Sequence, residues 1–189
     1  NIMRTTYLAS DYIYLLEAKI KECASIVQDD RVLPHTYDKT RSQWFIQRGG
    51  LMDKDTTLFK DQKASQKASQ AMALCENGQI EFRLCFRERA KTREIEIVNY
   101  RLSFLNLPDN PNNIQSLRYD YSTGQQRGPG WDDELGDNPE HPQAHLHINF
   151  TGNDRTANNL RMPTGQVGPI LILRAFDYWY GETFSNRGK

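Results

Sequence analysis

The sequence predicts an α+β protein, in which helices precede and follow an antiparallel sheet of at least four strands. Two observations predict this class. Segments in which apolar and polar side chains alternate every two residues gather in the middle of the chain, and segments with a helical period lie towards its ends. The connections have the composition of turns and loops, which argues against the strand–helix–strand units of a parallel sheet. We expect a single domain over residues 1–189, with residues 34–78 as a candidate for a loosely packed helical or hairpin lobe.

Composition limits the classes of function. The 189 residues include 24 Lys and Arg against 24 Asp and Glu, so the formal net charge is zero. This balance argues against binding of nucleic acid through bulk positive charge, although it allows a local basic groove. No apolar run reaches the ~20 residues of a membrane helix and no signal pattern is seen, so we expect a cytoplasmic protein without a membrane partner.

Cysteine usage is typical of a reducing compartment. The three cysteines, Cys23, Cys75 and Cys85, have no CxxC spacing, which disfavours a zinc site or a disulfide framework. Each has apolar neighbours, so a buried and inert thiol is the expected outcome.

The first helix is predicted by apolar side chains at steps of four and three residues, with Ser10 or Asp11 as its cap. These side chains form one stripe, which we expect to face the core: Tyr12, Leu16, Ile20, Cys23 and Val27. Residues 34–60 are ambiguous, because their apolar patches fit either a loose hairpin around Gly49-Gly50 or a helix-and-loop connection.

A second, short helix is predicted by the tandem repeat KASQKASQ at residues 63–70. Ala, Lys and Gln are good helix formers, and the run continues to Leu74 and ends near Asn77-Gly78. We expect its lysines to lie on a solvated face rather than in a phosphate site.

Four strands are predicted by two-residue alternation, over residues 80–86, 95–104, 117–121 and 146–150. The first two are close enough to form a hairpin through residues 88–92. Within the second strand, the apolar parity changes between Ile97 and Val98, which predicts a β-bulge there. Residues 124–143 form a long, acidic, irregular segment of the kind that is often functional.

The last helix begins after Gly168, with Pro169 at a first helical position. Its residues from Ile170 to Tyr180 are apolar or aromatic almost all round. Such a helix is either packed deeply on the sheet or shared with a partner.

Three of the four histidines fall within seven residues, in the segment EHPQAHLHINF. On a strand, His145 and His147 project to one face, with Asn149 beyond them. By the same parity, Arg118 and Asp120 lie on the polar face of the preceding strand. If the two strands pair, as sequential strands often do, these five side chains form one site.

Such a set suits cleavage of RNA without a metal or a cofactor. Two imidazoles can serve as general base and general acid, and Arg118 can hold a phosphate while Asp120 orients an imidazole. Three alternatives remain open at this point. The histidines can hold a divalent metal together with Asp120 or Asp133, they can belong to a histidine-triad nucleotide-binding strand, or they can be surface or structural residues.

The order of these motifs also resembles a known group of proteins. RYDY at 118–121, HP at 141–142, HLHINF at 145–150 and LRMP at 160–163 resemble a bacterial family of unknown function, and the pattern is similar to the TumE-like toxin-antitoxin proteins. The resemblance begins near Arg118 and covers the C-terminal part of the chain. It implies a cytoplasmic bacterial protein of toxin-antitoxin or antiviral defence systems, with five motif residues: Arg118, Asp120, His141, His145 and His147.

A second hypothesis makes the protein a non-enzymatic subunit of a bacterial defence or nucleoprotein complex. Aromatic side chains on the last helix and the acidic segment 124–143 then bind a protein partner or a second copy of the chain. The aromatic residues concerned are Phe176, Tyr178, Trp179 and Tyr180.

Overall fold

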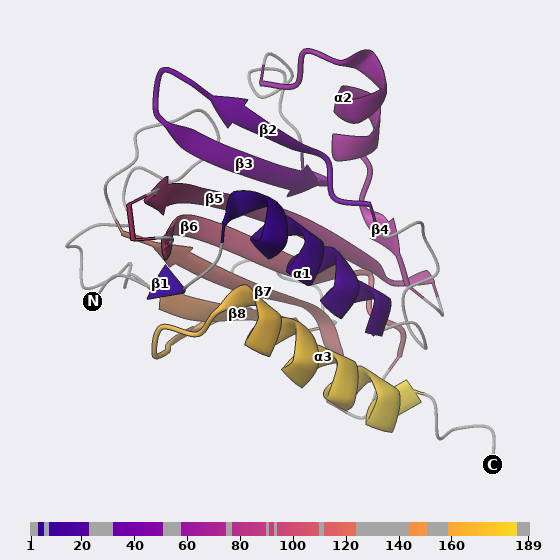
Figure 1. Ribbon diagram of the computed structural model, residues 1–189. Coiled ribbons are helices and arrows are strands. Elements are labelled where there is room, and N and C mark those ends of the chain that lie inside the picture. Colours follow the sequence, from indigo (N-terminus) through magenta and orange to yellow (C-terminus); the bar gives the residue numbers. More distant parts are fainter. Residues whose placement is uncertain are drawn as a thin grey trace.

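The computed structural model describes residues 4–5, 8–22, 32–50, 58–74, 77–89, 91–92, 94–109, 112–123, 144–150 and 159–184. Within these ranges, nine strands form one antiparallel sheet, accompanied by three helices (Figure 1). The α+β class predicted from the sequence is therefore confirmed.

The sheet follows the chain from one edge to the other. Its order is β2-β3-β5-β6-β7-β8-β9, with β1 paired to β6 and β4 paired to β5. Most strands pair with their neighbours in sequence. The strands are β1 (Arg4–Thr5), β2 (His35–Asp38), β3 (Gln43–Arg48), β4 (Met72–Ala73), β5 (Gln79–Arg89), β6 (Glu94–Leu105), β7 (Ile114–Ser122), β8 (Ala144–Phe150) and β9 (Asn159–Pro163).

Two helices, α1 (Ala9–Glu22) and α3 (Pro169–Phe184), lie across the same face of the sheet (Figure 1). Their buried side chains join those of the central strands in one apolar core. The predicted stripe of α1 is confirmed for Tyr12, Leu16 and Ile20, which are buried, whereas Cys23 and Val27 lie outside the described residues. None of the helices in the described ranges has both the length and the apolar character needed to cross a bilayer.

The bulge predicted near Val98 is confirmed. Cys85 on β5 pairs with Asn99 on β6, and the next residue, Phe86, pairs with Ile97, so Val98 has no opposite residue on β5. An extra residue reverses the alternation of a strand. Val98 consequently faces away from the helices, where it packs with Phe45 and Cys85 in a small second cluster. The buried thiol expected at Cys85 is also confirmed.

The N-terminal half corrects two details of the sequence analysis. A hairpin does form in residues 34–60, but its turn is at residues 39–42, before the glycines rather than around them. The second helix, α2 (Gln62–Ala68), ends before Leu74, because Met72 and Ala73 pair with β5 instead. Burial of Met72 against the sheet outweighs the helical preference of this alanine-rich run.

Two sets of hydrogen bonds attach connecting segments to the sheet. The fully buried Arg48, at the end of β3, donates from Nε to the Gln70 carbonyl at 3.0 Å and from Nη1 to the Val32 carbonyl at 2.9 Å. Between β9 and α3, the Tyr119 hydroxyl donates to the Gly165 carbonyl at 2.8 Å and accepts from the Val167 amide at 3.1 Å. The segments before β2, β4 and α3 are thereby held by side chains of the sheet.

Candidate functional site

The face of the sheet opposite α1 and α3 brings polar side chains into rows. Strand register places Arg101 of β6 opposite Asp120 of β7, and Asp120 opposite His145 of β8. The adjacent row on the same face contains Arg118 opposite His147. The pairing of β7 with β8, on which the sequence prediction depended, is therefore present in the structure.

Asp120 is the centre of this group. Its Oδ1 accepts from Arg101 Nε at 2.8 Å, and its Oδ2 lies 2.9 Å from Arg118 Nε. The same Oδ2 lies 3.2 Å from His147 Nε2 and 3.6 Å from His145 Nε2. The two imidazole rings also contact each other, with centroids 4.6 Å apart. We call Arg101, Arg118, Asp120, His145 and His147 the polar cluster.

The cluster has a buried inner layer and a more exposed outer layer. Exposed fractions are 3% for Asp120, 2% for His145 and 3% for His147. The side chains of Arg118 and Arg101 are 34% and 25% exposed. An approaching anion therefore meets the guanidinium groups first.

The charges within the cluster keep Asp120 ionised. Burial alone would raise the pKa of this carboxyl, but the hydrogen bond to His147 and the charges of Arg101 and Arg118 together hold its pKa well below the usual range. Asp120 is therefore ionised, and an acceptor, near neutral pH.

Arg118 and Asp120 both contact the same nitrogen of His147. Arg118 Nη2 lies 2.9 Å from His147 Nε2, and Asp120 Oδ2 lies 3.2 Å from it. A protonated Nε2 donates to Asp120, whereas an unprotonated Nε2 accepts from Arg118, so the tautomer of His147 decides which of the two it binds. As long as Arg118 stays in place, it covers the basic nitrogen of His147.

A divalent metal is the other occupant that these residues suggest. One ligand atom each from Asp120, His145 and His147 lies within 4.8 Å of the others, which is close enough for a shared ion. Arg118, however, already lies 2.9 Å from two of these ligand atoms, and Arg101 is a second positive charge on the same carboxylate. Two guanidinium groups around one carboxylate favour an anion over a cation.

The structure thus brings together four of the predicted site residues: Arg118, Asp120, His145 and His147. The alternative that these histidines are surface residues is wrong, since both rings are buried, whereas their contacts with Asp120 fit the structural alternative. Asn149 lies one row beyond His147 on the same face, as predicted, and donates to the Ser116 hydroxyl at 2.8 Å.

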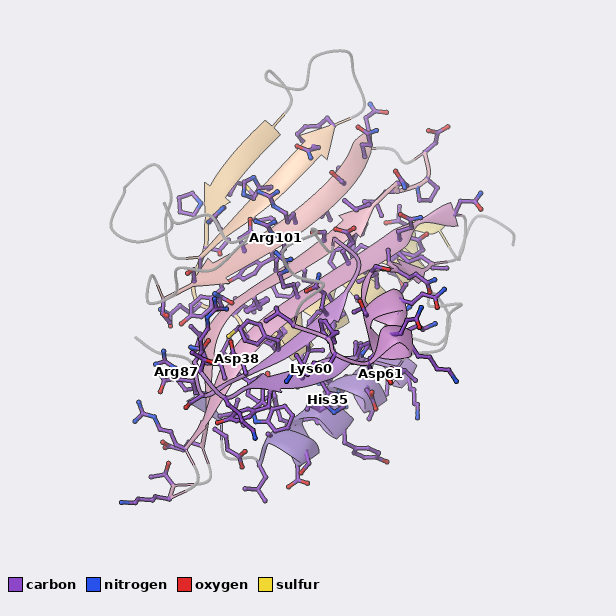
Figure 2. The ribbon with its side chains drawn as sticks, turned by 90° about the horizontal axis from the view of Figure 1, so that it is seen from above. His35, Asp38, Lys60, Asp61, Arg87 and Arg101 are labelled. Carbon is purple, nitrogen blue, oxygen red and sulfur yellow. The ribbon has the colours of Figure 1, made fainter. Side chains whose placement is uncertain are left out.

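The remaining predicted positions lie elsewhere. His141 and Asp133, with the whole acidic segment 124–143, lie outside the described residues. His35 is exposed near the β2 edge, where its Nδ1 lies 3.0 Å from the Leu33 carbonyl, and it lies apart from Arg101 (Figure 2).

Sequence reasoning missed one member of the cluster, Arg101. It occupies a polar position of a strand that we recognised only by its apolar residues. The alternation of Arg101 with Tyr100 and Leu102 indicates that its side chain lies on the polar face of the strand. Only the register of β6 with β7 shows that it is opposite Asp120.

Comparisons of this chain with protein-family models, with curated proteins and with solved structures found no match. The geometry of the polar cluster is therefore the basis for a function.

Proposed function

We propose that the polar cluster binds a phosphodiester of RNA and cleaves it, with His147 as general base and His145 as general acid. The observation that supports this most strongly is the arrangement of two outer guanidinium groups over two imidazoles that share one ionised carboxylate. Arginines bind phosphate and stabilise its developing charge, while paired imidazoles transfer protons near neutral pH.

Substrate binding uncovers the base in this proposal. A phosphate oxygen attracts the partly exposed guanidinium of Arg118 away from His147, and Asp120 remains neutralised by Arg101. His147 Nε2, in the tautomer that accepts from Arg118, then becomes available as a base. The burial of the two histidines in the absence of substrate follows from the same arrangement.

The reaction uses the nucleophile that RNA itself provides. His147 takes the proton of the 2′-hydroxyl, and O2′ attacks phosphorus. The bond to the 5′-oxygen breaks, and this oxygen takes a proton from protonated His145. The products are a 2′,3′-cyclic phosphate and a 5′-hydroxyl, and DNA cannot react because it lacks the 2′-hydroxyl.

The test is cleavage of a fluorescent RNA oligonucleotide in the presence of EDTA. We expect His145→Ala and His147→Ala each to lower the rate about 100-fold or more. His35→Ala, a matched change at an exposed ring remote from the cluster, should leave it unchanged. Full activity of either cluster variant would contradict the proposal, and activity that returns only with Mn²⁺ or Zn²⁺ would favour the metal alternative.

We further propose that this activity belongs to a toxin-like or defence-associated protein of the bacterial cytoplasm. Support comes from the resemblance of the RYDY and HLHINF segments to TumE-like proteins, since these segments provide the cluster residues. Induced expression in bacteria should arrest growth and reduce intact RNA, whereas His147→Ala should do neither. Growth arrest by both forms would show that toxicity does not depend on the cluster.

A second candidate is a non-enzymatic subunit that binds a partner through α3. Leu171 and Tyr178 on this helix are 59% and 73% exposed, although Phe176 and Tyr180 are buried in the core. Size-exclusion chromatography with light scattering tests it: Leu171→Ser with Tyr178→Ser should dissolve an oligomer if this surface joins two copies. A monomer in the unsubstituted protein would count against self-association.

A further inference from the structure

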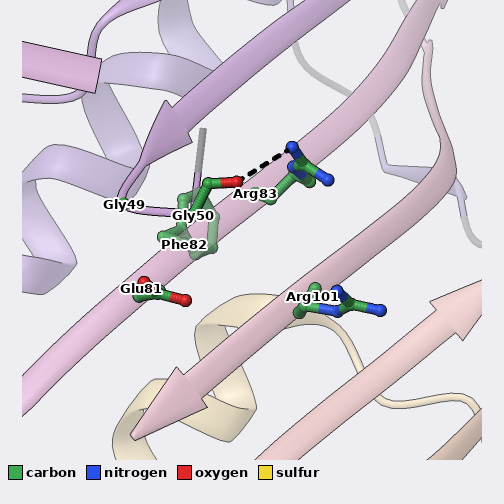
Figure 3. A pocket seen from close by; sticks show the side chains of 6 residues that line it. All are labelled: Gly49, Gly50, Glu81, Phe82, Arg83 and Arg101. Atoms are coloured by element: carbon green, nitrogen blue, oxygen red, sulfur yellow. Dashed lines mark hydrogen bonds between the residues drawn. The ribbon is translucent and has the colours of Figure 1, made fainter. Parts of the chain in front are cut away.

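A small hollow lies beside the polar cluster on the same face of the sheet. It is about 30 Å³ in volume and is lined by the end of β3, by β5 and by β6 (Figure 3). Its lining residues are Gly49, Gly50, Glu81, Phe82, Arg83 and Arg101. The hollow is too small for a nucleobase, but it can receive the polar edge of one.

One carboxylate and two guanidinium groups determine the chemistry of the hollow. Arg83 and Arg101 are opposite residues on β5 and β6, and Arg83 Nη2 donates to the Gly50 carbonyl at 3.4 Å (Figure 3). Burial raises the pKa of Glu81, while Arg101, Arg83 and a hydrogen bond from the Gly50 backbone oppose this rise. The hollow therefore places a carboxyl group beside two cationic donors.

The two glycines let the backbone lie close against the Glu81 side chain. A Cβ atom at Gly49 would lie 2.7 Å from Glu81 Cγ, and one at Gly50 would lie 3.3 Å from Glu81 Oε2. Both residues also have positive φ angles, 78° and 62°, which favour glycine. A side chain at either position would clash with Glu81, so only backbone atoms of these two residues line this side of the hollow.

Arg101 connects the hollow to the polar cluster. It lines the hollow, and its Nε donates to Asp120 at 2.8 Å. The hollow lies over β5 and β6, and the histidines lie on β8 beside β7. Because neighbouring strands are about 4.8 Å apart, Glu81 on β5 lies about 10 Å, or two strand spacings, from Arg118 on β7, and about 14 Å, or three spacings, from His147 on β8. The distance from the edge of a base to its phosphate is comparable to the spacing between Glu81 and Arg118.

Guanine is the base whose edge fits these groups. Its N1–H and N2–H₂ are adjacent donors, which match the two oxygens of a carboxylate, and its O6 and N7 accept from arginine. Adenine and cytosine each present a donor next to an acceptor, and uracil presents a single donor between two acceptors. These bases would leave a carboxylate oxygen facing an acceptor.

We propose that this hollow is a guanine-binding subsite, in which Glu81 accepts from the Watson–Crick edge while Arg83 or Arg101 donates to O6. The inference rests on the proposed function, because the phosphate 3′ to that guanosine is the one placed at Arg118 and His147. The protein is then a ribonuclease that cleaves after guanosine.

The test measures binding rather than cleavage, using calorimetric titration of the full chain with mononucleotides. We expect 3′-GMP to bind about tenfold or more tightly than 3′-AMP, since a base of the wrong pattern leaves buried polar groups unpaired. 3′-IMP, which lacks the N2 amino group, should fall between them. This comparison needs no variant, so it does not depend on how a substitution affects folding.

A pair of matched variants then locates the preference. Glu81→Gln should remove the preference for guanine while leaving binding of the phosphate, because a carboxamide replaces one acceptor with a donor. Glu88→Gln, the same change seven positions along β5, should keep the preference for guanine.

Equal affinity for 3′-GMP and 3′-AMP, or no binding of 3′-GMP at millimolar concentration, would overturn the subsite. Guanine preference without any RNA cleavage would instead overturn the proposed reaction and leave the subsite standing.

Discussion

At the scale of single residues, Asp120 contacts every other group in the polar cluster. It pairs with both arginines and lies against both imidazoles. A buried carboxylate in this position is stable only because its partners surround it. Replacing it leaves two cationic groups without their counter-charge.

We predict that Asp120→Asn lowers the free energy of unfolding at pH 7 by about 3 kcal/mol, since it breaks a buried ion-pair group. The difference from the unsubstituted protein should narrow as the pH falls below about 4. The pKa of Asp120 is depressed in the folded chain, so the unfolded chain binds the proton first and the stabilisation is lost on acidification.

Urea unfolding at pH 7 and at pH 3.5 checks this prediction. Asp109→Asn, at an exposed loop position, is the matched control and should change little at either pH. A difference between Asp120→Asn and the unsubstituted protein that is the same at both pH values would show that the carboxylate is not what stabilises the cluster.

How far the site follows from sequence differs from residue to residue. Residues His145 and His147 share a face because the strand period is two, and Arg118 joins them because its strand is the next along the chain. Burial of the rings was not predictable, because it depends on the packing of the whole face. The pairing of Asp120 with Arg101 depends on a register that no local pattern specifies.

At the scale of elements, strands with strict alternation were predictable and short strands were not. The bulge at Val98 was visible because a change of parity leaves a clear mark on an apolar pattern. Strand β4 was missed because the residues around Met72 favour a helix locally, and pairing with β5 overrides that preference. Strand β9 lacks an alternating pattern and occurs at a sheet edge.

Arg48 supports a prediction about how β3 holds its neighbours. Arg48→Met keeps most of the side-chain volume but leaves the carbonyls of Val32 and Gln70 without these donors. We expect a loss of about 2–4 kcal/mol in the free energy of unfolding, measured by urea denaturation. Lys63→Met, on the exposed surface of α2, should change it by less than about 0.5 kcal/mol. Equal effects of the two variants would contradict the assigned role of Arg48.

Tyr119 supports a second prediction, which concerns α3. Tyr119→Phe removes the hydroxyl that both donates to Gly165 and accepts from Val167. Amide hydrogen exchange in residues 164–172 should accelerate, with a loss of about 1–2 kcal/mol in local stability. Tyr178→Phe, on the exposed side of the same helix, should not alter exchange. Unchanged exchange in Tyr119→Phe would mean that the segment is held by other contacts.

At the scale of the whole molecule, the two faces of the sheet differ in the side chains that they bury. One face is apolar and packs against both helices, so it provides the core. The other face buries polar and charged side chains, which contribute little to a core unless their partners are satisfied. The fold class was predictable because it follows from the first face, whereas the candidate function depends on the second.

We predict that the chain unfolds as one cooperative unit. A single apolar core includes side chains of α1, of α3 and of strands from β3 to β7, and residues from the 34–78 segment, such as Ile46 and Met72, are part of it. Urea transitions followed by circular dichroism and by tryptophan fluorescence should therefore coincide. Two separate midpoints would indicate that residues 34–78 form a lobe with a stability of their own.

Arg101 has an energetic consequence for the molecule as a whole. A single guanidinium belongs to both the hollow and the cluster, so an occupant of one place changes the field and the orientation felt at the other. Thermodynamic linkage makes this influence reciprocal: if a base raises the affinity for phosphate by some factor, phosphate raises the affinity for that base by the same factor. A dinucleotide would then be held more tightly than its separate fragments suggest, and a single side chain would set the degree of that cooperativity.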